Sequence, residues 1–134
     1  MKFLSIRIIT ANVQRLVAFY EQVTGLTPTW FTEDFAELVT PVGTLAIASE
    51  RTVKQFAEGA ARPAANSSVI IELMVADVDA TYRAIEPLIG KALQEPTTMP
   101  WGNRSLLFRD PDGNLVNLFT PATEAASKKF ARWL

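Results

Sequence analysis

Apolar residues recur along the chain with two periods, and these periods predict its secondary structure. Residues 3–9 are mostly β-branched or aromatic, which is typical of a strand. Over residues 13–23 the apolar positions recur every three or four residues, which predicts a helix that Asn12 caps and Gly25 ends. Three short strand-like runs follow, at residues 27–32, 35–40 and 44–49.

The second half repeats this order. Residues 68–75 predict a strand, and a helical pattern then runs between Asp77 and Gly90. Pro87 indicates that this helix kinks or stops early. Thr123 is expected to cap a short C-terminal helix. Three more strands are expected at residues 92–97, 104–109 and 115–120, the last two joined by the hairpin turn at 110–114.

Landmarks in the two halves recur at two spacings, each kept by several residues, which indicates an internal duplication. Asn12 and Gly25 have counterparts 65 residues later in Asp77 and Gly90. A second set, 70 residues apart, matches Pro41, Gly43 and Leu45 with Pro111, Gly113 and Leu115. Coincidence among common turn residues is the alternative explanation. We expect one α+β domain of two tandem βαβββ modules, with the boundaries 1–50 for the first module, 51–67 for a linker that is partly helical at its start, 68–121 for the second module and 122–134 for the C-terminal helix.

The amino-acid composition argues against nucleic acid and membranes as binding partners. The chain of 134 residues is 49% hydrophobic, so it is not disordered. Its 13 basic and 14 acidic residues give a net charge of -1, which offers no basic surface for nucleic acid. No apolar run reaches membrane-spanning length and the N-terminus lacks the layout of a signal peptide, so we expect a cytoplasmic protein without a membrane partner.

Two residue types are missing, and their absence restricts the chemistry. The chain has no Cys and no His. Thiolate nucleophiles, catalytic triads and the commonest metal ligand are therefore excluded. Catalysis would have to use carboxylates, Lys, Tyr or Arg, and this raises the expectation of a binding protein.

Three segments resemble a known family. Residues 18–20 (AFY) with the following Gly25, residues 75–80 (VADVDA) and residues 108–114 (FRDPDGN) are similar to motifs of the vicinal oxygen chelate superfamily, which includes glyoxalases, bleomycin resistance proteins and extradiol dioxygenases. The resemblance covers residues 3–121. It implies that the strands of each module curl into half of a cup, that the two modules form a cupped mixed sheet around one cavity, and that the helices lie outside. It also implies a homodimer.

The resemblance locates the positions where metal-dependent members hold their ion. One ligand comes seven residues before each helix-capping residue, and another comes four residues after each hairpin glycine. These positions hold Ser5, Ile47, Ile70 and Asn117 in this chain. Two aliphatic side chains and two neutral oxygen donors do not suit a catalytic divalent ion, which prefers imidazole or carboxylate ligands. We therefore expect no metal and no other cofactor.

Strand alternation assigns other side chains to the cup. Ser5 and Arg7 should face it from the first strand, and Ile70 and Glu72 from the equivalent strand of the second half. We expect Arg7 and Glu72 to pair, either as a structural ion pair or as a polar anchor for a ligand. Asn117 and Phe119 should face the cup from the last strand.

Aromatic and basic side chains on loops and edges complete the predicted site. Trp101 lies on a loop that is longer in the second half, where it could stack on a planar ligand or merely plug the cup. Trp30 and Phe31 could form the opposite wall, although core packing is the commoner role of such residues. Arg104 could meet an anionic group, although it could equally be a solvated surface charge. Asp110 and Asp112 belong to the hairpin turn and not to acid–base chemistry.

Three functions remain open. The first is metal-independent binding of a hydrophobic or aromatic small molecule, in the manner of drug-resistance members that sequester a drug or metabolite. The second is a lyase, isomerase or dioxygenase with a degenerate or unrecognised active site. The third is a structural or regulatory subunit whose cup is filled by its own side chains.

Overall fold

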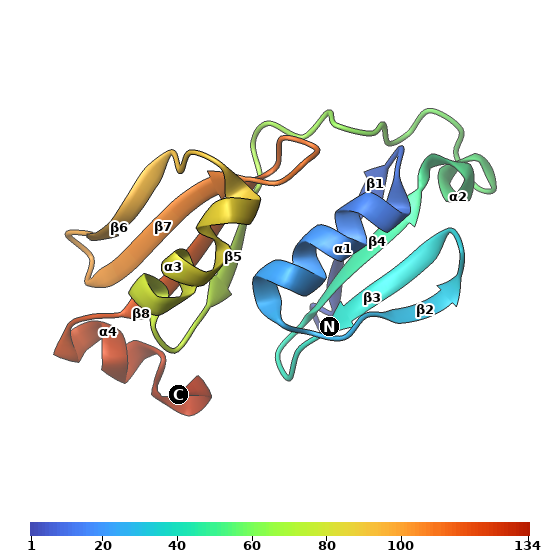
Figure 1. The fold of residues 1–134 in the computed structure, drawn as a ribbon. Coiled ribbons are helices and arrows are strands. Elements are labelled where there is room, and N and C mark those ends of the chain that lie inside the picture. The colour runs from blue at the N-terminus through green and yellow to red at the C-terminus, as the bar shows by residue number, and fades with distance from the viewer. The chain divides into compact units, whose positions relative to one another are not determined.

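The computed structural model describes the whole chain, residues 1–134, as two compact units. The first unit contains residues 1–66 together with the three turn residues 111–113. The second unit contains residues 67–110 and 114–134. Each unit is built around one four-stranded sheet (Figure 1).

The first unit begins with a βαβββ succession. Its elements are β1 (Ser5–Thr10), α1 (Val13–Thr24), β2 (Thr29–Thr32), β3 (Phe35–Val39), β4 (Thr44–Ser49) and α2 (Glu50–Lys54). The strand order is β1-β4-β3-β2, with β1 parallel to β4 and the other neighbours antiparallel. This mixed sheet follows from the crossover through α1, since only a crossover returns the chain for parallel pairing.

The second unit repeats that topology. Its elements are β5 (Ile70–Met74), α3 (Val78–Ile89), β6 (Gln94–Thr98), β7 (Asn103–Arg109), β8 (Leu115–Pro121), α4 (Glu124–Lys129) and a short 3₁₀ helix (Ala131–Trp133). The strand order is β5-β8-β7-β6, again with one parallel pair, β5 and β8. The predicted α+β class and the double βαβββ order are therefore confirmed.

Both long helices begin and end where the sequence predicts. The side chains of Asn12 and Asp77 accept hydrogen bonds from backbone N–H groups in the first turns of α1 and α3. Gly25 has a φ of 72°, the left-handed conformation that ends α1. The expected early stop at Pro87 is wrong, because α3 continues to Ile89. Pro87 lies in the last turn, where its missing N–H costs a single hydrogen bond.

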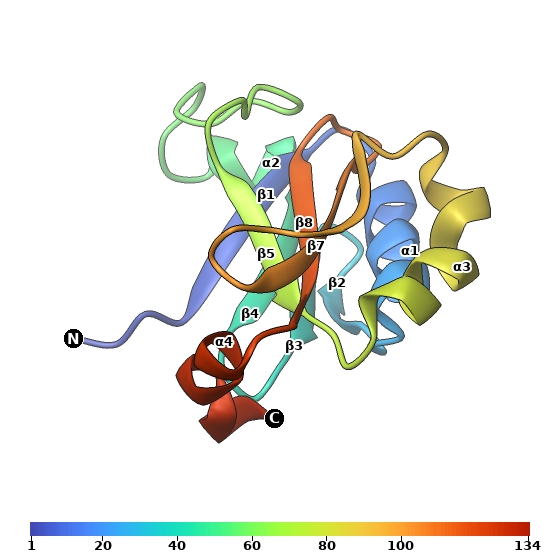
Figure 2. The same ribbon diagram turned by 90° about the vertical axis from the view of Figure 1, so that its left-hand side faces the viewer.

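Two hydrogen-bonded contacts show which face of the second sheet α3 covers (Figures 1 and 2). The backbone N–H of Val78 donates to Thr120 Oγ1 at 2.9 Å, and Arg104 donates to Asp79 at 2.7 and 2.9 Å. Because Thr120 and Arg104 face α3, strand alternation places their immediate neighbours Phe119 and Ser105 on the opposite face. We call that opposite side of the β5-β8-β7-β6 sheet the open face because α3 does not cover it, although Ser105 and Phe119 themselves are buried.

The core of each unit lies between its long helix and the covered face of its sheet. Fully buried side chains of α1 and of strands β3 and β4 include Leu16, Tyr20, Leu38 and Ile47. In the second unit Leu106, Phe108, Val116 and Leu118 fill the corresponding place. None of the helices combines the length and the apolar character needed to cross a membrane.

Candidate functional site

The open face of the second unit has a polar centre made by two neighbouring strands. Glu72 of β5 and Asn117 of β8 are register partners, so their side chains leave the sheet on the same side. Asn117 Nδ2 donates a hydrogen bond to Glu72 Oε2 at 2.8 Å. Glu72 is exposed, whereas Asn117 is only 8% exposed. The pair therefore joins an accessible carboxylate to a buried amide.

Two buried polar atoms on this face have no hydrogen-bond partner. They are Asn117 Oδ1 and Ser105 Oγ. Ser105 pairs in register with Phe119, and Asn117 pairs with Leu107, so the two residues are diagonal neighbours on one face. Ser105 was not among the site residues predicted from the sequence. Its sequence position could have predicted its face. Leu106 faces the core, so strand alternation places Ser105 on the opposite side, with Asn117.

The C-terminal segment supplies an aromatic border to the open face. Phe119, which is 7% exposed, has its ring centre 5.2 Å from that of Phe130 at the end of α4. Phe130 in turn lies 6.2 Å from Trp133. Phe119 therefore combines a position beside Asn117 with an aromatic contact to the C-terminal segment.

Arg104 occupies the other side of the sheet. Its Nε and Nη2 atoms donate to the two carboxylate oxygens of Asp79 on α3, at 2.7 and 2.9 Å. These hydrogen bonds lower the pKa of the Asp79 carboxyl and raise that of the Arg104 guanidinium. The structure thus places Arg104 against a helix, apart from the open face, and shows it neither in the cup nor as an unpaired surface charge.

Ser5 and Arg7 lie on β1 of the first unit, and both are exposed. The Arg7 guanidinium carbon lies 4.9 Å from the ring centre of Phe35, a cation–π arrangement. Arg7 and Glu72 belong to different units, and each has a contact within its own. Their pairing stays a prediction.

The register of β2 separates its two aromatic residues. Trp30 pairs with Ala36, which pairs with Ile47 of the core. Phe31 instead contacts the ring of Phe35, at 5.6 Å between centres. Trp30 therefore shares the side of Ile47, and Phe31 shares the side of Phe35 and Arg7.

The predicted position of Ile47 in the cup is wrong. β1 and β4 pair so that Arg7 lies opposite Ala46, whereas Ile47 lies opposite Ile8. Ile47 is 1% exposed and belongs to the core of the first unit. The cause is one additional residue in the turn of the second hairpin. That turn is closed by a hydrogen bond from Asp110 N to Asn114 O, whereas the first turn is closed by one from Thr40 N to Gly43 O. The counterpart of Asn117 is therefore Ala46.

The four corrected positions do not fit a divalent metal. They hold Ser5, Ala46, Ile70 and Asn117. A methyl group and an aliphatic side chain donate nothing, and Glu72 is the single carboxylate next to Asn117. No group of three or more acidic side chains comes together anywhere along residues 1–134. This donor set lacks the imidazole or multiple carboxylates that such ions require.

Trp101 is 66% exposed on the loop between β6 and β7. The loop is closed by hydrogen bonds from Met99 N to Asn103 O at 2.8 Å and from Gly102 N to Met99 O at 2.9 Å. A closed loop with an exposed indole suits a stacking contact. Its role in ligand binding stays a prediction.

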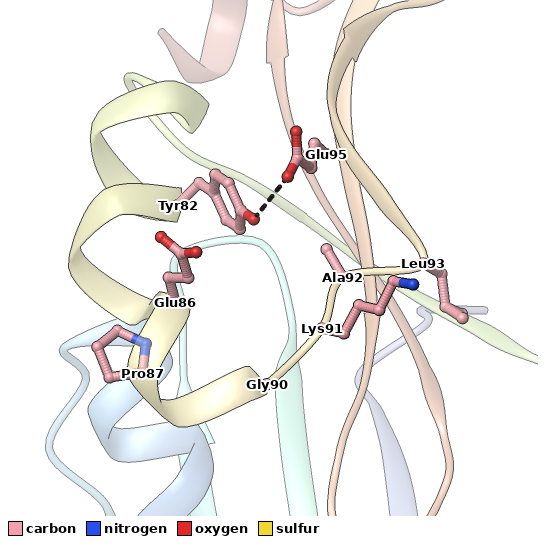
Figure 3. A pocket seen from close by; sticks show the side chains of 8 residues that line it. All are labelled: Tyr82, Glu86, Pro87, Gly90, Lys91, Ala92, Leu93 and Glu95. Carbon is pink, nitrogen blue, oxygen red and sulfur yellow. Dashed lines mark hydrogen bonds between the residues drawn. The ribbon is translucent and has the colours of Figure 1, made fainter.

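A separate pocket lies at the end of α3 (Figure 3). Its volume is about 780 Å³, and Tyr82, Glu86, Lys91 and Glu95 contribute its polar groups. The Tyr82 hydroxyl donates to Glu95 Oε1 at 3.3 Å. Partial removal from water and the two neighbouring carboxylates raise the pKa of the Tyr82 phenol. Neither Glu72 nor Asn117 lines this pocket.

Residues 2–118 match the family model described as the Glyoxalase/Bleomycin resistance protein/Dioxygenase superfamily. The chain is 28% identical to the uncharacterized protein YraH of Bacillus subtilis, over 89% of this chain and 98% of that protein.

Solved structures show the same fold at lower identity. A glyoxalase/bleomycin resistance protein/dioxygenase family enzyme from Burkholderia phytofirmans superposes with a TM-score of 0.78 at 16% identity, over 90% of this chain and 99% of the other. A protein of unknown function from Agrobacterium tumefaciens gives a TM-score of 0.77 at 22% identity, over 90% and 94% of the two chains.

Proposed function

Since the chain belongs to the glyoxalase/bleomycin resistance protein/dioxygenase superfamily, we propose that it binds a hydrophobic or aromatic small molecule without a metal ion, on the open face of the second unit. Sequestration of a drug or metabolite is the biological role that such binding would serve. The proposal rests on the side chains at the four positions where metal-dependent members of the superfamily hold their ion. Asn117 is hydrogen-bonded to Glu72, and Ser5, Ala46 and Ile70 together offer one hydroxyl group.

The mixture of apolar and polar side chains on the open face supports binding of a small molecule there. A ligand site is mostly apolar, with a few polar groups that fix the orientation of the ligand. Leu107, Leu115 and Phe119 provide apolar surface around Asn117, according to the strand register. The unpartnered atoms Asn117 Oδ1 and Ser105 Oγ provide the polar groups.

A thermal-shift screen against aromatic metabolites and antibiotics, run with a chelator in the buffer, tests the proposal. A ligand present at 100 times its Kd stabilises the folded state by about 2.7 kcal/mol, which raises the Tm by about 8 °C in a chain of this length. We expect Trp101→Ala to reduce the shift and Asn117→Leu to abolish it.

Trp30→Ala is the matched control, because it removes an aromatic side chain of the first unit that lies on the side of the core. The Tm shift caused by the ligand should survive in this variant. A screen in which compounds stabilise the protein only after a divalent metal is added would contradict the proposal.

A further inference from the structure

The orientation of the Asn117 amide is fixed by its neighbour. Its Nδ2 donates to Glu72 Oε2 at 2.8 Å. A rotated amide would bring the carbonyl oxygen against a carboxylate oxygen, and neither atom has a hydrogen to share. The Asn117 Oδ1 acceptor is therefore directed away from Glu72, and it is buried without a partner.

A second buried oxygen lies on the same face. Ser105 is 3% exposed, and its Oγ has no hydrogen-bond partner. Buried polar atoms in folded proteins almost always have a partner, so these two atoms are available for hydrogen bonds from water or from a ligand. Asn117 is more than nine-tenths buried as well, so both unpartnered atoms belong to buried side chains and not to exposed ones.

Glu72 makes the charge of this centre negative. Its exposed carboxylate accepts from Asn117 through one oxygen and has further lone pairs to offer. Arg109 lies opposite Leu115 on β7 and shares this face. Lys129 and Arg132 lie over the rings of Phe130 and Trp133 at its aromatic border, at 5.1 and 4.0 Å. β8 separates β7 from β5, so Ser105 and Arg109, both on β7, are each two strands, about 10 Å, from the strand of Glu72. Asn117 on β8 lies between them and Glu72.

Most of the polar groups that a ligand would contact on this face are hydrogen-bond acceptors. The Asn117 carbonyl and the Glu72 carboxylate accept only, and the Ser105 hydroxyl can also accept. A carboxylate or phosphate ligand would place charge of the same sign against Glu72. A neutral carbonyl would add one more acceptor. A group with several N–H donors and a positive charge matches these acceptors and the charge of Glu72.

This inference rests on the proposed function and names the class of its ligand. We propose that the open face recognises an aromatic compound with a protonated nitrogen head (amidinium, guanidinium or primary ammonium) whose N–H groups donate to Glu72 and Asn117 Oδ1, with Ser105 Oγ as a further acceptor on the next strand. The head enters from the side of the exposed Glu72. The aromatic body of the compound packs beside Phe119 and Phe130, whose rings are tilted by 53° to each other.

Three naphthalene derivatives test this assignment by calorimetric titration of the full chain in a chelator. Naphthalene-2-carboximidamide carries an amidinium head, naphthalene-2-carboxamide a neutral head and naphthalene-2-carboxylate an anionic head, on one aromatic body. We expect the amidinium to bind about tenfold or more tightly than the carboxamide, since hydrogen bonds to charged groups are the stronger ones. We expect the carboxylate to bind weakest.

Two glutamine variants locate the site. Glu72→Gln keeps an oxygen for Asn117 but removes the charge, so it should abolish the preference for the amidinium. Glu95→Gln is the matched control, because Glu95 lies in the pocket beside α3, where a cation could also bind (Figure 3). Both side chains are exposed. Thermal unfolding should be measured for each variant to check that it is folded.

The outcomes separate this inference from the proposed function. Equal binding of all three probes, tightest binding of the carboxylate, or no binding of the amidinium would overturn the inference. A preference lost in Glu95→Gln and kept in Glu72→Gln would overturn it too, as would stabilisation by Mg²⁺ or Ca²⁺ alone that Glu72→Gln removes. The proposed function fails separately, when the chelator-containing screen finds no ligand at all.

Discussion

Arg104 shows how one side chain can serve the fold instead of a ligand. Its planar guanidinium matches both oxygens of Asp79, so two parallel hydrogen bonds tie β7 to the first turn of α3. Asp79 also suits the N-terminal end of a helix, where the backbone N–H groups favour negative charge. Both side chains are partly exposed, so solvent screening limits what the pair adds to stability.

This pair predicts a pH dependence of stability. The hydrogen bonds from Arg104 lower the pKa of Asp79 in the folded state below its usual 3.8. The contribution is therefore present above the unfolded pKa, at neutral pH, and is lost as the pH falls through the folded value. Asp79→Asn should lower the free energy of unfolding at pH 7, and its difference from the original protein should shrink in acid.

Urea denaturation at pH 7 and at several values below pH 4 checks this expectation. Arg104→Gln removes the same pair from the other side, so it should cost a similar amount, and the double variant should cost little more than either single one. A deficit in Asp79→Asn that stays constant down to the most acidic pH would contradict the assignment.

The faces of single side chains were predictable where polarity alternates, and not elsewhere. In β5 the change from Ile71 to Glu72 marks the two sides, and the structure places Ile71 in the core and leaves Glu72 exposed. In β4 the neighbours of Ile47 are Ala46 and Ala48, so polarity gives no such signal. The face of Ile47 was then predicted from its distance in sequence to the turn. That prediction failed because the turn of the second hairpin has one residue more than the turn of the first.

Helices and strands were easier to predict than the turns between them. Cap residues and periodic apolar positions define the helices, and these signals lie within the elements themselves. The contact of Phe130 with Phe119, the unpartnered Ser105 hydroxyl and the pairing of Arg104 depend on how elements pack. No local pattern in the sequence encodes such packing.

The attachment of α4 depends on a glycine in the loop before β7. Gly102 has a φ of 98°, and a Cβ there would lie 2.3 Å from Thr123 Oγ1 and 3.2 Å from Ala126 Cβ. The Gly102 carbonyl also accepts a hydrogen bond from Ala122 N at 2.8 Å. Close approach of the backbone to α4 therefore requires a residue without a side chain.

Gly102→Ala should consequently destabilise the protein by about 1–3 kcal/mol from the steric clash, in addition to the backbone strain. Chemical denaturation measures the change. Gly59→Ala is the control, since Gly59 also has a positive φ, of 78°, but nothing lies within 4 Å of its Cβ position. Equal losses in the two variants would show that α4 does not pack against Gly102.

As a whole, the chain repeats one topology in two halves that differ in their side chains. The sheets share one strand order, and the cap residues of α1 and α3 occupy equivalent positions. The polar pair Glu72 and Asn117 of the second unit corresponds to Arg7 and Ala46 in the first. The shared topology agrees with the predicted internal duplication, and the differences at these positions give the second unit its candidate site.

Metal content tests the central claim most directly. Elemental analysis of protein purified without chelator should find iron, nickel, zinc and manganese at well below one ion per chain, because Ser5, Ala46, Ile70 and Asn117 are too poor a donor set to retain one. One tightly held ion per chain, lost in both Asn117→Leu and Glu72→Gln, would contradict the account.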